Sequence, residues 1–119
     1  MNLQESGEMY LETILVLTKK NTLVRSIDVS EHLGVTKPSV SRAIGLLRDG
    51  GYVLMDKNGH LSLTPLGEEV AIKMYERHKI LSDFFISIGV SESTATEDAC
   101  KIEHHISDEA FEAIKRQLK

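Results

Sequence analysis

The stretch SIDVSEHLGVTKPSVSRAIGLL, residues 26–47, decides the fold. Its first eight residues predict a short helix, for which Ser26 is a candidate N-cap. Gly34 follows as a C-terminal stop that tolerates a positive φ. Thr36 is then a candidate N-cap for a second helix, and Pro38 lies in its first turn, where the missing N–H costs nothing. The sequence therefore predicts two consecutive helices separated by a tight turn.

The apolar residues of this stretch follow the register of a helix-turn-helix motif, which buries Val29, Leu33, Val35, Val40 and Ile44. Two ordinary packed helices joined by a glycine are the alternative. The complete register favours DNA binding, with the second helix in the major groove. Hydroxyl groups there can contact phosphates, and an arginine can reach a base edge or a phosphate. The side chains that we expect to face DNA are Thr36, Lys37, Pro38, Ser39, Ser41 and Arg42.

The chain after this motif predicts a β-hairpin. Residues 52–56 and 60–64 have the pattern of two strands, and the Asn58-Gly59 pair between them is a strong hairpin signal. A helix-turn-helix followed by a hairpin is a winged helix. Lys57 at the tip of the wing is a candidate phosphate contact, although an ordinary exposed loop lysine is nearly as good an interpretation.

The remaining sequence predicts helices only. Residues 5–20 precede the motif as one helix, and a long helix begins after Thr64, an N-cap followed by Pro65. Further helices begin after Ser91 and after Ser107. We therefore expect a mainly α protein, with a winged helix-turn-helix domain in residues 1–66 and a helical domain in residues 67–119.

The single cysteine lies in a segment rich in metal-binding side chains. Within a helix, Cys100, Glu103 and His104 are spaced i, i+3 and i+4, so a sulfur, an oxygen and a nitrogen donor share one face. Such a set can hold a divalent cation if other elements complete it. The alternative for Cys100 is a small buried hydrophobic residue, a common role for a free cysteine.

Composition sets the limits of the interpretation. The 119 residues suffice for one domain or for a compact unit with an extension, and the net charge of −4 argues against general binding of polyanions but not against a local DNA-binding surface. No apolar run is long enough for a membrane span, and the N-terminus does not resemble a signal peptide. One cysteine cannot form an internal disulfide, which points to the cytoplasm.

Taken together, these features resemble the diphtheria toxin repressor family of iron- and manganese-dependent repressors. The motifs that carry the resemblance span nearly the whole chain: Glu8–Glu12, Leu33–Ser41, Thr64–Gly67, Arg77-His78 and Cys100–His105. Each is weak alone, but five in order are specific. Some relatives carry a further SH3-like domain, and because this sequence ends at Lys119 the resemblance implies a short form without it.

The resemblance implies a homodimer that binds a palindromic operator when loaded with Fe(II) or Mn(II), and it implies no enzymatic activity. It also implies a ligand set. Met9, Cys100, Glu103 and His104 match the primary metal site of the iron-responsive members, whereas Glu12 and His78 match positions in the two-metal site of the manganese-responsive members. The other helical ligands of the iron-type ancillary site fall at Ser82 and Thr96, which are poor ligands.

Ligand chemistry favours Fe(II), because thioether and thiolate prefer later divalent ions to Mn(II). Mn(II) is the alternative, and Zn(II), Co(II) or Ni(II) can bind in vitro. Three other functions stay open at this point. The chain can be a winged-helix regulator that does not sense metal, a protein with a purely structural zinc site, or a metalloenzyme in which Glu103 is a general base.

Overall fold

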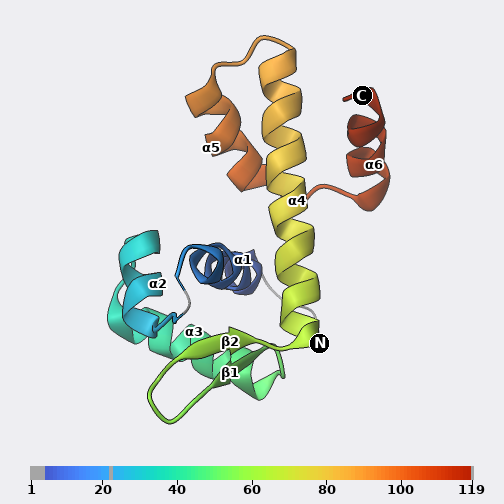
Figure 1. Ribbon diagram of the computed structural model, residues 1–119. Coiled ribbons are helices and arrows are strands. Elements are labelled where there is room, and N and C mark those ends of the chain that lie inside the picture. The colour runs from blue at the N-terminus through green and yellow to red at the C-terminus, as the bar shows by residue number, and fades with distance from the viewer. Residues whose placement is uncertain (1–4, 22, 119) are drawn as a thin grey trace. The chain divides into compact units, whose positions relative to one another are not determined.

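The computed structural model of the protein describes residues 5–21 and 23–118. These residues form α1 (Glu5–Lys20), α2 (Ser26–Leu33), α3 (Lys37–Asp49), β1 (Val53–Met55), β2 (Leu61–Leu63), α4 (Pro65–Ser87), α5 (Glu92–Ile102) and α6 (Asp108–Gln117) (Figure 1). The mainly α, winged-helix prediction is confirmed. The chain divides into two compact units, Met1–Ile72 and Lys73–Lys119. The domain boundary at residues 66 and 67 stays a prediction.

The turn between α2 and α3 is built as the sequence predicts. Gly34 has φ +70°, and its N–H donates to the Ser30 carbonyl at 2.9 Å. The Ser30 hydroxyl in turn donates to the Val35 carbonyl at 2.6 Å. Thr36 caps α3 by accepting a hydrogen bond from the Ser39 N–H at 3.3 Å. The turn therefore satisfies its own polar groups and fixes the two helices relative to each other.

Two details of the helix-turn-helix prediction are wrong. The N-cap of α2 is Arg25, and Ser26 is the first helical residue. The reason is that Arg25 is held extended by a β-bridge to His60, while its N–H donates to the Asp28 carboxylate at 2.9 Å. Of the residues expected in the core, Leu33 and Val35 are only half-buried because they lie at the turn. The buried positions Val29, Val40 and Ile44 agree with the prediction.

The wing is shorter than expected. β1 and β2 pair antiparallel through Val53–Leu63, Leu54–Ser62 and Met55–Leu61. The strands stop there because the Asp56 carboxylate accepts the N–H groups of Asn58 and His60, at 2.8 and 2.9 Å, and closes the tip. The Leu61 N–H also donates to the Val24 carbonyl at 2.7 Å, so the segment before α2 lies along the free edge of β2.

Gly67 marks a close backbone contact at the start of α4. A Cβ atom at this position would lie 2.0 Å from the Tyr52 carbonyl oxygen. The Thr64 N–H donates to that same oxygen at 3.1 Å, and the Thr64 hydroxyl accepts from the Gly67 N–H at 3.1 Å. Only glycine allows the first turn of α4 to pack this closely against the end of the wing.

The second unit consists of the later part of α4 together with α5 and α6. Its core contains Leu81 of α4, Ala99 of α5 and Phe111 of α6. α5 and α6 lie along the same half of α4 (Figure 1). The prediction that Glu103 and His104 continue a helix is wrong, because α5 ends at Ile102 and both residues lie in the turn that follows. Their spacing stays close to helical, since Glu103 has φ −58° and ψ −28°.

Candidate metal centre and DNA-contacting surface

Glu103 is the centre of the candidate metal site. Only 1% of the residue is exposed, although it carries a carboxylate. Its Oε1 atom lies 3.0 Å from His78 Nδ1, whereas Oε2 is buried without a hydrogen-bond partner. A buried carboxylate normally requires a hydrogen-bonding partner, a counter-charge or a metal ion. A buried carboxylate oxygen that accepts no hydrogen bond therefore indicates a site for a cation.

His78 and Cys100 bring two further donor atoms to Glu103. Cys100 Sγ lies 3.6 Å from His78 Nδ1, and the ligand atoms of His78, Cys100 and Glu103 all lie within 4.8 Å of one another. Metal–ligand bonds of about 2.0–2.3 Å place ligands on opposite sides of one ion roughly 4–4.6 Å apart, so the three atoms have the spacing of a coordination shell. The hydrogen bond to the Glu103 carboxylate raises the pKa of His78, against the burial of the ring, which lowers it.

The other predicted ligands have different positions. His104 Nε2 lies 4.0 Å from Glu103 Oε2, so the two carboxylate oxygens face different imidazoles. The family resemblance assigns Cys100 and His78 to separate sets, but in the structure both lie beside the side chain of Glu103. Met9 and Glu12 lie three residues apart on α1, in the first unit. Their role as ligands stays a prediction.

Ser82 and Thr96 take the place of ligands that an iron-type ancillary site would need. Their hydroxyl oxygens lie 3.5 Å apart, within hydrogen-bonding distance of each other. Neutral hydroxyls of this kind are weak ligands for a divalent ion. The three-donor cluster of the second unit is thus His78, Cys100 and Glu103.

The residues predicted to contact DNA lie on the surface of the first unit. All of them are exposed: Thr36, Lys37, Pro38, Ser39, Ser41, Arg42 and Lys57. On the opposite side of α3, Val40, Ile44 and Leu47 are buried. The N-terminal part of α3 therefore presents a polar, partly basic face, and Lys57 lies at the tip of the wing. This is the arrangement in which a recognition helix and wing approach DNA, although the individual contacts stay predictions.

Sequence reasoning missed one residue beside the metal cluster. The sequence motif contains Arg77 only as the neighbour of His78, yet Arg77 is 5% exposed and donates to the main chain of the turn that carries Glu103. An arginine within an amphipathic helix is expected at the surface. The sequence holds no local signal for its burial, because its partners lie 26 to 31 residues further along the chain.

Two models of known protein families match the chain, and together they include parts of both units. The family model for the N-terminal DNA-binding domain of iron-dependent repressors matches residues 2–61. The model for the metal-binding and dimerisation domain of the same repressors matches residues 64–119. The fold and site thus define a winged-helix regulator with a metal-binding domain. The chain belongs to the iron-dependent repressor family, which includes the diphtheria toxin repressor relatives predicted from its motifs.

Individual relatives are transcriptional regulators. The chain is 36% identical over 105 residues to the transcriptional regulator MntR of Salmonella typhimurium, covering 88% of this chain and 67% of that protein. It is 34% identical over 109 residues to the MntR of Lysinibacillus sphaericus, covering 92% of this chain and 78% of the relative. The prediction that the chain is a regulator and not an enzyme is confirmed by this kinship.

Solved structures share the fold. The manganese regulator SloR superimposes with a TM-score of 0.84 at 26% identity, over 99% of this chain and 54% of that one. IdeR of T. acidophilum gives 0.81 at 25% identity, over 98% and 55%. The chain thus spans about half the length of these solved proteins. None of the described helices has both the length and the apolar character that a membrane span requires.

Proposed function

We propose that the chain is a metal-activated repressor that binds a palindromic operator as a homodimer, with Fe(II) as its preferred activator. The observation that carries the proposal is the buried Glu103, whose Oε2 has no hydrogen-bond partner, together with the donor atoms of His78 and Cys100 that cluster with its carboxylate. Membership in a family of metal-dependent repressors supports the same function.

The choice of metal rests on Cys100. A thiolate in the cluster favours Fe(II) over Mn(II), because softer ligands prefer later divalent ions. Mn(II) is the second candidate, since relatives are named as manganese regulators and His78 matches a ligand of the manganese-responsive members. The family resemblance adds three further ligands: His104, and Met9 and Glu12 of α1. We propose Met9 and Glu12 as ligands on the ground of the resemblance alone.

The chain's own residues suggest how occupancy controls DNA binding. A bound divalent ion supplies the positive charge that compensates Glu103. His78, Cys100 and Glu103 would hold it. Within the first unit α1 packs against α2 and α3, so a metal ligand on α1 would be connected to the DNA-binding helices. Two α3 helices in a dimer then read half-sites about 34 Å apart, one turn of DNA. Such a protein acts in the cytoplasm, where DNA is present and the reducing environment keeps the thiol of Cys100 reduced.

The test combines DNA selection with metal titration. A pool of random 30-base-pair duplexes is selected for binding under anaerobic conditions with Fe(II), and the enriched duplex is used for fluorescence anisotropy with Fe(II), Mn(II) or chelator. We expect binding that requires metal and saturates at a lower concentration of Fe(II) than of Mn(II). Sedimentation of the loaded complex gives the number of chains per duplex. Binding that is indifferent to chelator contradicts the proposal and favours a regulator that does not sense metal.

A further inference from the structure

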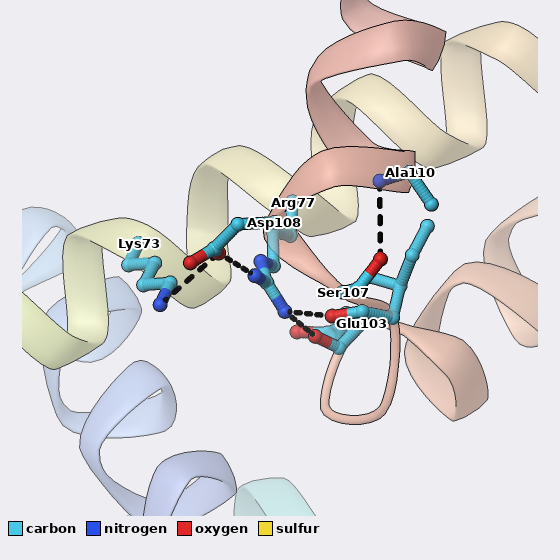
Figure 2. Close-up of polar contacts among 7 residues, drawn as sticks. Lys73, Arg77, Glu103, Ser107, Asp108 and Ala110 are labelled. Atoms are coloured by element: carbon cyan, nitrogen blue, oxygen red, sulfur yellow. Dashed lines mark hydrogen bonds and ion pairs between the residues drawn. The ribbon is translucent and has the colours of Figure 1, made fainter.

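Arg77 is buried next to the metal cluster without belonging to it. Its Nη1 atom donates to two main-chain carbonyls, that of Glu103 at 3.1 Å and that of Ile106 at 2.8 Å. Its Nη2 atom donates to the carboxylate of Asp108 (Figure 2). The guanidinium carbon also lies 5.5 Å from the centre of the Phe111 ring, within range of a cation–π contact.

These contacts hold the turn that carries the metal-binding side chains. α5 ends at Ile102, so the carbonyls of Glu103 and Ile106 lie beyond the helix and need partners from elsewhere. Arg77 provides donors for both of them, at either end of the segment from Glu103 to Ile106. The planar guanidinium places Nη1 at these two carbonyls and Nη2 at Asp108 in a fixed geometry, whereas a lysine ammonium is a point charge on a flexible stem. The backbone on which Glu103 and His104 are mounted is therefore oriented by Arg77.

The same side chain reaches the beginning of α6. Asp108 is the first residue of that helix, and Ser107 caps it by accepting from the Ala110 N–H at 3.1 Å. Lys73 lies 3.5 Å from the same Asp108 oxygen, so two basic residues of α4 face one carboxylate (Figure 2). A third ion pair between α4 and α6, Glu76 with Lys115 at 3.0 Å, is exposed and does not touch the turn.

We infer that Arg77 is a positioning residue for the metal centre, which fixes the turn bearing Glu103 and His104 and ties it to the first turn of α6. The inference rests on the proposed function, because it concerns the affinity for metal. Coupling between two parts of a protein is reciprocal. A metal ion that holds Glu103 in place therefore also strengthens the attachment of α6, and the loss of Arg77 weakens metal binding without removing any ligand.

The first experiment titrates Co(II) anaerobically and follows its visible absorption, which reports both affinity and coordination geometry. The test variant is Arg77→Lys, which keeps the charge but loses the fork. We expect affinity to fall about 10- to 100-fold, as for other residues that orient metal ligands, with a changed absorption spectrum. The control is Lys115→Met, which removes the exposed α4–α6 ion pair and should leave both unchanged. A folded Arg77→Lys protein with the affinity and spectrum of the wild type overturns the inference.

The second experiment needs no variant of Arg77 and applies even if that variant does not fold. Hydrogen exchange of the α6 amides is measured in the wild type with and without Co(II). We expect exchange to slow on metal addition, and unchanged exchange at saturating Co(II) overturns the inference. Glu103→Gln distinguishes a failure of the proposed metal centre from a failure of the role inferred for Arg77. If this variant binds Co(II) like the wild type, the proposed metal centre itself is wrong; if it loses Co(II) while Arg77→Lys does not, only the role of Arg77 is wrong.

Discussion

His78 and Glu103 lie 25 residues apart in the sequence, yet His78 Nδ1 and Glu103 Oε1 are 3.0 Å apart. The contact joins α4 to the turn after α5 and leaves the second carboxylate oxygen buried without a hydrogen-bond partner. A charge in this position is unfavourable until a cation compensates it. We therefore predict that metal binding stabilises the second unit, and this can be measured.

Glu103→Gln should separate metal binding from folding. Glutamine keeps the shape of the side chain but carries no charge, so the metal-free variant should be no less stable than the metal-free wild type. The wild type should gain about 2.7 kcal/mol when free metal is at 100 times its Kd, and the variant should gain far less. Urea unfolding with Co(II) or with chelator measures both. Equal stabilisation of the two proteins by metal contradicts the site.

Cys100→Ala should abolish Fe(II)-dependent DNA binding, because it removes the sulfur donor 3.6 Å from His78 Nδ1. Lys101→Ala is the matched control, since it changes the next, exposed residue of α5 and no proposed ligand. Anaerobic anisotropy with the selected duplex is the measurement. An unchanged Fe(II) titration for Cys100→Ala shows that the thiol is not a ligand.

Carboxylates in place of the sulfur donors should shift the metal preference. The double variant Met9→Asp with Cys100→Glu replaces both proposed sulfur donors by carboxylates. Hard oxygen ligands suit Mn(II), so the ratio of Mn(II) to Fe(II) affinity should rise. Competition between the two ions, with bound metal counted per chain, gives the ratio. A constant ratio indicates that other features of the site select the metal.

Gly67→Ala should destabilise the first unit, because its Cβ would lie 2.0 Å from the Tyr52 carbonyl oxygen. Forcing the first turn of α4 away from the wing should cost about 1–3 kcal/mol, as for other overpacked sites. Gly45→Ala in α3 is the control. No atom lies within 4 Å of its added Cβ, so it should be neutral or stabilise the helix by up to about 1 kcal/mol. Thermal unfolding of Gly67→Ala and Gly45→Ala measures both changes in stability. Equal changes in the two variants contradict the close contact at Gly67.

Arg42→Ala and Lys57→Ala should weaken DNA binding in different ways. An arginine at a base edge contributes about 1–3 kcal/mol and sequence preference, whereas a lysine at a phosphate contributes affinity without preference. We therefore expect Arg42→Ala to relax the selected sequence, and Lys57→Ala to lower the salt dependence of the logarithm of affinity by about one unit. Lys79→Ala, exposed on α4, is the control. Equal loss with unchanged sequence preference in both variants places Arg42 on the phosphate backbone.

Asp108 should make the second unit sensitive to acid. The charge of Lys73, followed by the contact with Arg77, holds the pKa of Asp108 below its usual range. A carboxyl group whose pKa is lower in the folded state adds stability above its unfolded pKa, and this is lost as pH falls through the folded-state value. Asp108→Asn should therefore be less stable than the wild type at neutral pH, and the difference should vanish in strong acid.

Urea unfolding at a series of pH values gives this comparison. Glu109→Gln, one residue further along α6, is the matched control and should show a smaller dependence on pH. A difference between the wild type and Asp108→Asn that persists unchanged into strong acid excludes the ion pairs as its cause.

Much of the fold follows from local sequence patterns. Gly34, Thr36 and Ser91 act within four residues of their own positions, and they end or begin helices where the sequence predicts. Arg25 shows where such reasoning fails, because it displaces Ser26 as the cap of α2 through a bridge to His60, 35 positions away. Helix caps can thus be predicted from neighbouring residues unless a distant strand holds the chain extended.

The sequence by itself determined the order of elements, the helix-turn-helix register and the residue types of a metal site, since all of these depend on spacings of two to four residues. The tertiary structure was needed to show that His78 and Cys100 cluster with Glu103, and that Arg77 is buried against the turn between α5 and α6. These relationships depend on how α4, α5 and α6 pack around Leu81, Ala99 and Phe111. Side chains distant in sequence come together only when that core forms, and no local pattern encodes their distance.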